Sequence, residues 1–196
     1  MQFRSLAVFC GSADGLEPVY TEAAQMMGRL LAEKKIALVY GAGRTGMMGA
    51  LAQGYLQVGG ECIGVVPRGL ESPQLVYTTE LSRVELVENI QQRKARMNEL
   101  ADGFIVLPGG FGTLDEMFEV LTWSQIGLHR KPVALLNVNG YYDDLLQWIQ
   151  RANQDHFIYE EHLGLLAADP TPEGLLAKLA EFRFPEKIER WLVREG

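Results

Sequence analysis

Short apolar segments alternate with longer segments of helical periodicity along this chain. The apolar segments are continuous rather than alternating with polar residues, which is typical of strands buried on both faces of a parallel sheet. Strands are predicted at Leu6–Cys10, Ile36–Tyr40, Cys62–Val66, Phe104–Leu107 and Val133–Val138. Helices are predicted at Pro18–Glu33, Met47–Val58, Asn89–Ala101, Thr113–Ile126, Tyr142–Asp155 and Pro172–Phe182, the last with Thr171 as its N-cap, and a short helix could lie within Glu186–Arg194.

This alternation of strands and helices predicts the fold class. We expect an α/β protein: a single Rossmann-like domain over residues 1–196, with a doubly wound parallel sheet and helices on both faces. Neither a linker nor an internal repeat interrupts the pattern. Because such folds bind ligands at the carboxyl ends of their strands, binding residues are expected directly after the apolar segments.

Composition and charge argue against several classes of protein. Hydrophobic residues make up 47% of the chain and charged residues 22%, as in ordinary globular proteins. The net charge of −7, without a stripe of lysines and arginines, argues against nucleic-acid binding, although backbone donors could still bind a single phosphate. Because Leu6–Cys10 is too short for a signal peptide or a membrane span, we expect a cytoplasmic location and no membrane contact.

The cysteines and histidines suggest neither a disulfide nor a metal site. Cys10 and Cys62 both lie in apolar segments, which favours buried, reduced thiols. His129, His156 and His162 lack the spacing of metal ligands, and we expect them on the surface or in loops.

Glycine-rich turns follow three of the predicted strands. They are Gly11-Ser12, the segment Gly41–Gly46 and the segment Pro108–Thr113. Tight turns from strand to helix often need glycine, so one such turn would be weak evidence. Three turns that leave backbone amides uncovered at helix starts favour a phosphate-binding protein.

The second turn matches the dinucleotide fingerprint G-x-G-x-x-G, so a nicotinamide or flavin enzyme is an alternative to a mononucleotide-binding protein. That fingerprint requires an acidic residue at the end of the following strand. The strand here ends Val66-Pro67-Arg68, and Glu61 lies at its other end. The sequence therefore argues against a dinucleotide.

Two cations adjoin the apolar face of the predicted helix Asn89–Ala101. Its inward stripe is formed by Ile90, Met97, Leu100 and Ala101, and Arg93 and Lys94 lie beside it. A buried guanidinium is costly without a partner, so Arg93 should contact either a protein carboxylate or a ligand phosphate. Lys94 could instead extend outward to solvent.

Glu116 has two interpretations. The segment Thr113–Glu116 fits a capping box, in which the Glu116 carboxylate would accept a hydrogen bond from the Thr113 amide. Its place in the first turn after Gly109-Gly110 would also let it face a sugar whose phosphate binds that turn. This position makes Glu116 a candidate catalytic residue.

Several motifs together resemble the LOG ("Lonely Guy") family of cytokinin riboside 5′-monophosphate phosphoribohydrolases. They are Gly41-x-Gly43-x-x-Gly46-Met47-Met48-Gly49, Arg93-Lys94 and Pro108-Gly109-Gly110-x-Gly112-Thr113-x-x-Glu116, within a resemblance running from Cys10-Gly11-Ser12 to Asn139-Gly140-Tyr141-Tyr142. The resemblance implies cleavage of the N-glycosidic bond of a nucleoside 5′-monophosphate, with no redox cofactor or metal. It implies Arg93 and Glu116 as the catalytic pair and substrate contacts by Ser12, Gly43, Lys94, Gly109, Gly110, Gly112, Thr113 and Thr122.

The implied chemistry suits these residue types. Cleavage builds positive charge on the ribose, which the Glu116 carboxylate can stabilise while it orients the attacking water. The pKa of Arg93 is too high for proton donation, so orientation of the carboxylate and of ribose hydroxyls suits it better.

The chain departs from the family pattern at a few positions, and these leave the preferred base undecided between adenine and a cytokinin. Ala42 replaces the central glycine of a triple glycine, and Asn89-Ile90 replaces Asp-Met before Arg93. An acidic residue usual in the preceding loop has no clear counterpart among Glu71, Gln74 and Glu80.

Two other functions deserve comparison with hydrolysis. A non-catalytic nucleotide or cofactor carrier could use the same glycine turns, but the intact Arg93 and Glu116 argue against it. A pyridoxal-phosphate decarboxylase would need a Schiff-base lysine, for which Lys94 is the only candidate.

The resemblance also implies a homodimer. Its apolar interface could include Met47, Met48, Phe118 and Trp123, although packing in the core suits these four residues better.

Overall fold

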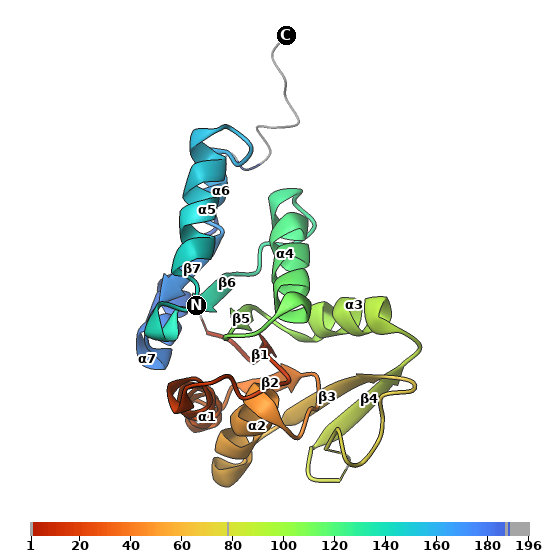
Figure 1. Ribbon diagram of the computed structural model, residues 1–196. Helices are drawn as coiled ribbons and strands as arrows, with labels where there is room; N and C mark the ends of the chain where they lie inside the picture. The colour runs from red at the N-terminus through yellow and green to blue at the C-terminus, as the bar shows by residue number, and fades with distance from the viewer. Residues whose placement is uncertain (1, 78, 187, 189–196) are drawn as a thin grey trace.

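The computed structural model describes residues 2–77, 79–186 and 188 (Figure 1). Within them one sheet of seven parallel strands is flanked by helices. The strands are β1 (Ser5–Phe9), β2 (Ala37–Tyr40), β3 (Cys62–Pro67), β4 (Arg83–Val87), β5 (Phe104–Val106), β6 (Val133–Leu136) and β7 (Leu166–Asp169). The helices are α1 (Pro18–Glu33), α2 (Gly46–Val58), α3 (Ile90–Leu100), α4 (Phe111–Gln125), α5 (Asp143–Gln154), α6 (Glu160–Leu163) and α7 (Pro172–Glu181), with a 3₁₀ turn at Val138–Gly140.

The strand order confirms the predicted doubly wound sheet. The order is β4-β3-β2-β1-β5-β6-β7, and every recorded pair is parallel. The chain moves outward from β1 to β4 and then returns to place β5 on the other side of β1. The carboxyl ends of β1 and β5 therefore form the point at which strand order reverses, where such folds bind ligands.

Helices cover both faces of the sheet, and alternate residues of each strand contact opposite layers (Figure 1). Leu6 and Val8 of β1 pack in the layer that includes α1, α2 and α7. Ala7 and Phe9 pack in the layer that includes Met97 of α3. Because the central strands are buried on both faces, their sequences are continuously apolar, as predicted.

The edge strands β4 and β7 were not predicted. Both are only partly buried, and β4 mixes charged and apolar residues in the sequence Arg83–Val87. An edge strand has a neighbour on one side only, so it lacks the continuous apolar signal of a central strand. The predicted segment Glu186–Arg194 lies outside the described residues, apart from 186 and 188.

The predicted N-cap Thr171 is confirmed, and Asn89, predicted as the first residue of its helix, is an N-cap as well. The Asn89 side chain accepts a hydrogen bond from the amide of Gln92 at 2.9 Å, and Thr171 accepts one from the amide of Gly174 at 3.1 Å. These side chains satisfy amides that have no partner inside the helix.

The cysteines lie as predicted, whereas one histidine does not. Cys10 and Cys62 are buried and free of disulfides. His156 is exposed and His129 lies in a loop, but His162 is buried on α6. The prediction for His162 was wrong because its ring packs edge-on against Tyr159, with Nε2 3.2 Å from the carbonyl oxygen of Ile188.

No helix within the described part of the chain is long and apolar enough to cross a membrane.

Candidate functional site

The first and third glycine turns lie side by side where the strand order reverses. The amide of Gly11, after β1, donates a hydrogen bond to the carbonyl oxygen of Pro108 at 3.0 Å. A Cβ added to Gly11 would lie 3.3 Å from Cα of Gly109, so the backbones approach closely. The two turns thus form one continuous floor at the carboxyl ends of β1 and β5.

Helix α4 begins on this floor, two residues before its predicted start. Gly110 is the N-cap, and the amide of Leu114 donates to its carbonyl oxygen at 3.1 Å. The predicted capping box was wrong because Thr113 is already inside the helix and caps nothing. Within the described residues, the amides of Phe111, Gly112 and Thr113 have no acceptor. Such a helix start attracts an anion.

Two tyrosine hydroxyls donate hydrogen bonds to the backbone of the third turn, and we call this pair the tyrosine brace. The Tyr142 hydroxyl donates to the carbonyl oxygen of Leu107 at 2.8 Å, and the Tyr141 hydroxyl donates to that of Gly109 at 2.8 Å. The amide of Tyr142 in turn donates to Oδ1 of Asn137 at 2.7 Å. The segment after β6 therefore fixes the backbone that leads into α4.

Arg93 and Glu116 form an ion pair beside these two turns. Nη2 of Arg93 lies 3.4 Å from Oε1 of Glu116, and their side chains are only 16% and 10% exposed. Gly41, at the end of β2, makes room for the guanidinium, since a Cβ there would collide with Nη2 of Arg93. The first predicted partner of Arg93, a protein carboxylate, is therefore present.

One donor of Arg93 has no partner. Its Nε is buried and lacks an acceptor among the described residues. Buried donors are nearly always satisfied, so an unpaired one in a cavity suggests a ligand oxygen or an ordered water.

Burial governs the protonation of Glu116. Loss of hydration raises its pKa, the Arg93 guanidinium lowers it, and the balance brings the pKa of Glu116 to about 6. Burial raises the pKa of the Cys10 thiol well above its usual range, and the negative charge of the nearby Glu116 raises it further. Near neutral pH the site thus contains a carboxylate beside a neutral thiol.

These groups line a cavity of about 410 Å³. Seven predicted site residues line it: Ser12, Arg93, Lys94, Gly110, Gly112, Thr113 and Glu116. Ile90, predicted on the buried stripe of its helix, is instead 41% exposed at this cavity because the first turn of α3 borders it. The alternative that Lys94 extends to solvent was wrong, since its Nζ contacts Asp115 and Glu119.

Three predicted residues lie outside the lining of this cavity. Gly109 forms the turn beneath it, where a Cβ would collide with Oγ1 of Thr113. Thr122 is exposed, more than two turns farther along α4. Gly43 lies in the second glycine turn.

The second glycine turn is closed by the protein's own backbone. Gly43 pairs with Val76 in an antiparallel bridge, and the amide of Arg44 donates to the carbonyl oxygen of Leu75 at 2.9 Å. At the start of α2, the amides of Met47 and Met48 donate to carbonyl oxygens of the loop after β1, at 3.2 and 3.3 Å. The expectation that all three turns leave amides uncovered was therefore wrong for this turn.

Sequence reasoning missed the contacts that support the site: Gly41 against Arg93, the tyrosine brace, and the carboxylates around Lys94. The only available signal for the brace was that Tyr141-Tyr142 belongs to the segment of family resemblance.

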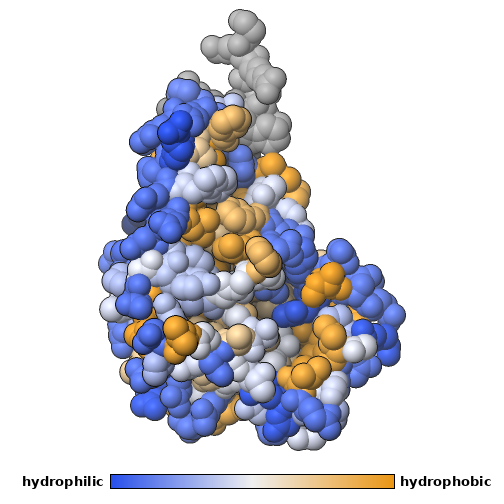
Figure 2. Space-filling view, viewed as in Figure 1, coloured by the Kyte–Doolittle hydropathy of each residue, from blue (hydrophilic) through white to orange (hydrophobic). Residues whose placement is uncertain are grey.

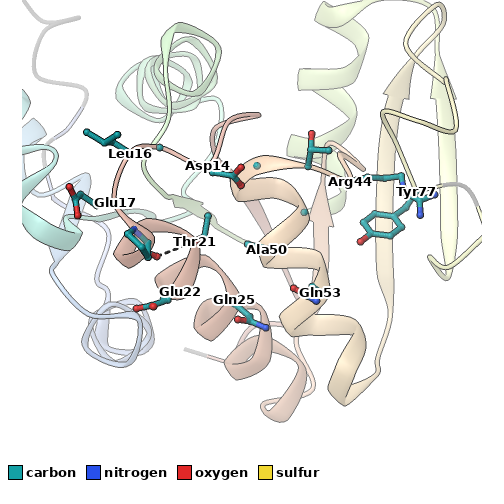
Figure 3. A pocket seen from close by; sticks show the side chains of 15 residues that line it. Asp14, Leu16, Glu17, Thr21, Glu22, Gln25, Arg44, Ala50, Gln53 and Tyr77 are labelled. Atoms are coloured by element: carbon teal, nitrogen blue, oxygen red, sulfur yellow. Dashed lines mark hydrogen bonds between the residues drawn. The ribbon is translucent and has the colours of Figure 1, made fainter.

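A larger hollow of about 670 Å³ lies between the starts of α1 and α2 (Figure 3). Its charged lining residues, which include Asp14, Glu17 and Arg44, are exposed. The Arg44 guanidinium lies over the Tyr77 ring, 4.7 Å from its centre, and 3.4 Å from Glu80. Because these charges remain hydrated, the hollow offers weaker chemistry than the smaller cavity.

The fold and the cavity define an α/β protein in which a helix start with uncovered amides lies beside a buried carboxylate–guanidinium pair. The family model described as "Possible lysine decarboxylase" matches residues 48–179. The cytokinin riboside 5′-monophosphate phosphoribohydrolase LOG7 of Arabidopsis thaliana is 43% identical over 92% of this chain and 83% of its own length. The enzyme LOG of Oryza sativa subsp. japonica is 43% identical over 92% of this chain and 74% of its own. The chain belongs to this LOG family.

Solved structures confirm the fold at greater distance. The molybdenum cofactor binding protein of Rippkaea orientalis superimposes with a TM-score of 0.68 at 22% identity, covering 90% of this chain and 95% of that one. A Moco carrier protein of Chlamydomonas reinhardtii gives a TM-score of 0.67 at 17% identity, covering 91% and 96%. At these identities the likeness extends to the fold alone.

Proposed function

We propose that this chain is a single catalytic domain that hydrolyses the N-glycosidic bond of a nucleoside 5′-monophosphate, releasing the free base and ribose 5-phosphate. The observation that carries the proposal is the buried pair of Arg93 and Glu116 beside the uncovered amides of α4. The names of the relatives support the same reaction.

The phosphate binds the start of α4 in this proposal. The amides of Phe111, Gly112 and Thr113 supply hydrogen bonds, and the helix dipole adds favourable potential. Glu116 lies on the same helix, so a phosphate bound there brings the ribose toward its carboxylate. Main-chain donors thus hold the phosphate without a protein cation.

Glu116 acts on the anomeric carbon. As the bond from C1′ to the base breaks, positive charge develops on the ribose, and the carboxylate stabilises it. The same carboxylate orients a water molecule that attacks C1′. The reaction consumes one water, whose oxygen bonds to C1′ as the bond to the base breaks and one of whose protons ends on the departing base nitrogen. It requires Glu116 to be ionised, and a pKa of about 6 leaves this carboxylate charged at neutral pH.

Arg93 orients this carboxylate. Nη2 contacts Glu116, while the unpaired Nε remains available for a ribose oxygen. A guanidinium stays charged throughout, so it contributes geometry and charge rather than a proton.

AMP and a cytokinin riboside monophosphate are the proposed substrates. Incubation of the protein with AMP and with isopentenyladenosine 5′-monophosphate, followed by chromatography of the products, tests both. The proposal expects free base from at least one, and none from Glu116→Gln. Tight binding of both nucleotides without release of base would instead support the carrier alternative.

A decarboxylase activity fits this site poorly, despite the description of the family model. Burial would lower the pKa of Lys94, but hydrogen bonds with Asp115 and Glu119 outweigh it and raise the pKa. A Schiff base forms from a neutral amine, and this ammonium is stabilised in its charged form.

A cytoplasmic homodimer completes the proposal. Figure 2 shows apolar side chains gathered on the surface between α4 and α5. Phe118 of α4 packs edge-on against Trp148 of α5, with their ring centres 5.9 Å apart, and Trp148 is 53% exposed. Of the predicted interface residues, Met47 is buried in the core, while Met48, Phe118 and Trp123 are half-buried. A solution mass of one chain would contradict the dimer.

A further inference from the structure

A lysine beside the proposed catalytic pair binds two carboxylates. Nζ of Lys94 lies 2.9 Å from Oδ2 of Asp115 and 3.0 Å from Oε1 of Glu119. The side chains of Lys94 and Glu119 are 11% and 25% exposed, whereas that of Asp115 is 60% exposed, so solvent screens the contact with Glu119 less than the contact with Asp115. Lys94 directly follows Arg93 on α3, and the two carboxylates flank Glu116 on α4. These ion pairs therefore join the same two helices as Arg93 and Glu116.

We infer that Lys94 is a positioning residue, which clamps α3 to α4 and so sets the distance between Arg93 and Glu116. The inference rests on the proposed hydrolase function, and it differs from the substrate contact that family resemblance implies for Lys94. An ammonium group has three donors, of which two serve Asp115 and Glu119. The two carboxylates would also repel a phosphate approaching Nζ.

The proposed catalytic pair needs such support because its own contact is loose. Its separation of 3.4 Å exceeds the roughly 2.7–2.9 Å of a strong charge-assisted hydrogen bond. Asp115 and Glu119 are four residues apart, and hence neighbours on one face of α4. An ammonium group between them restricts both sliding and rotation of α4 against α3.

Lys94 also balances the charge around Glu116. The charged and titratable groups that act on Glu116 are Arg93 and Lys94 from α3 and Asp115 and Glu119 from α4, and the buried Cys10 thiol lies beside it after β1. Besides burial, which raises the pKa of Glu116 most, Asp115 and Glu119 raise it and the two cations lower it. Without Lys94, Arg93 would be the one cation of this group left to offset the two carboxylates.

Kinetics of Lys94→Met and Lys94→Arg test the clamp. Lys178→Met is the matched control, since Nζ of Lys178 forms an ion pair with Asp169 at 3.0 Å, outside the lining of the cavity. We expect Lys94→Met to lower kcat for AMP about 100-fold, the effect of misplacing a catalytic group by about 1 Å. Its KM, and inhibition by ribose 5-phosphate, should stay within about twofold of the wild type. Lys94→Arg should recover most of kcat, because a guanidinium can bridge both carboxylates.

A ¹³C NMR titration of the Glu116 carboxyl tests the clamp without turnover. Lys94→Met should raise the pKa of Glu116, and Glu119→Gln should lower it. If Lys94→Met does not fold, Glu119→Gln replaces it and should reduce kcat with KM retained.

Two outcomes separate this inference from the proposed function. A rise in KM of about tenfold with kcat and the Glu116 titration unchanged would overturn the clamp and make Lys94 a substrate ligand. A wild-type protein that releases no base from either nucleotide would contradict the proposed function. The titration would then be the remaining test of the clamp, and an unshifted pKa of Glu116 in Lys94→Met would refute it.

Discussion

Glu116 illustrates how one buried carboxylate can be both costly and useful. Burial removes hydration from its charged form, and Arg93 restores only part of that stabilisation. The result is a carboxylate whose pKa is raised from 4.5 to about 6. Such a shift is common at catalytic sites, although structural ion pairs also produce it.

The pH dependence of turnover follows from this shift. Because the reaction needs ionised Glu116, kcat/KM for AMP should fall about tenfold for each unit of pH below about 6. A pH–rate profile between pH 4.5 and 8, with a stable fold confirmed at each end by circular dichroism, measures it. An acidic limb near pH 4.5 would mean that burial does not control this group.

Gly41 provides a second test at the residue scale. A methyl group at this position would collide with Nη2 of Arg93 and displace the guanidinium. Gly41→Ala should therefore lower kcat about 100-fold, while the affinity for AMP changes little because the phosphate binds elsewhere. Steady-state kinetics together with calorimetric binding distinguish the two effects, and a kcat within twofold of the wild type would contradict the assigned packing.

At the scale of elements, the sequence was most informative where burial is complete. The central strands were predicted because both of their faces are apolar, whereas β4 and β7 escaped because edges are partly solvated. The start of α4 was misjudged since Thr113 resembles an N-cap, although Gly110 takes that position. A local sequence pattern cannot show that the helix begins earlier, at Phe111, with its first amides uncovered.

Among the site residues, those in local motifs could be predicted, whereas contacts between distant segments could not. Arg93 and Glu116 were identified by motif and location, and the structure brings them together. The partners of Lys94 lie 21 and 25 residues along the chain, so only tertiary structure reveals them. The closing of the second glycine turn likewise depends on a bridge from Gly43 to Val76, which no local pattern encodes.

The tyrosine brace gives a prediction at the element scale. Tyr142→Phe leaves the buried carbonyl oxygen of Leu107 without its donor and should lower the free energy of unfolding by about 1–3 kcal/mol. Tyr141 is 45% exposed, so water can replace its hydroxyl, and Tyr141→Phe should cost less. Urea denaturation of both variants compares them. Equal losses would show that burial of the hydroxyl does not decide the effect.

At the scale of the molecule, the sheet topology places the whole site. The order reversal between β1 and β5 brings Gly11 against Pro108, and α3 and α4 then supply Arg93 and Glu116 from one layer. Solved structures with 22% and 17% sequence identity share this fold. The fold alone therefore leaves the chemistry open, and the pair in the cavity carries the functional argument.

The most direct test is a crystal structure of Glu116→Gln with bound AMP. The account predicts the phosphate within hydrogen-bond distance of the amides of Phe111–Thr113, with C1′ of the ribose facing the side chain at position 116. A phosphate bound elsewhere, for example in the hollow between α1 and α2, with residue 116 directed away from the ribose, would contradict it.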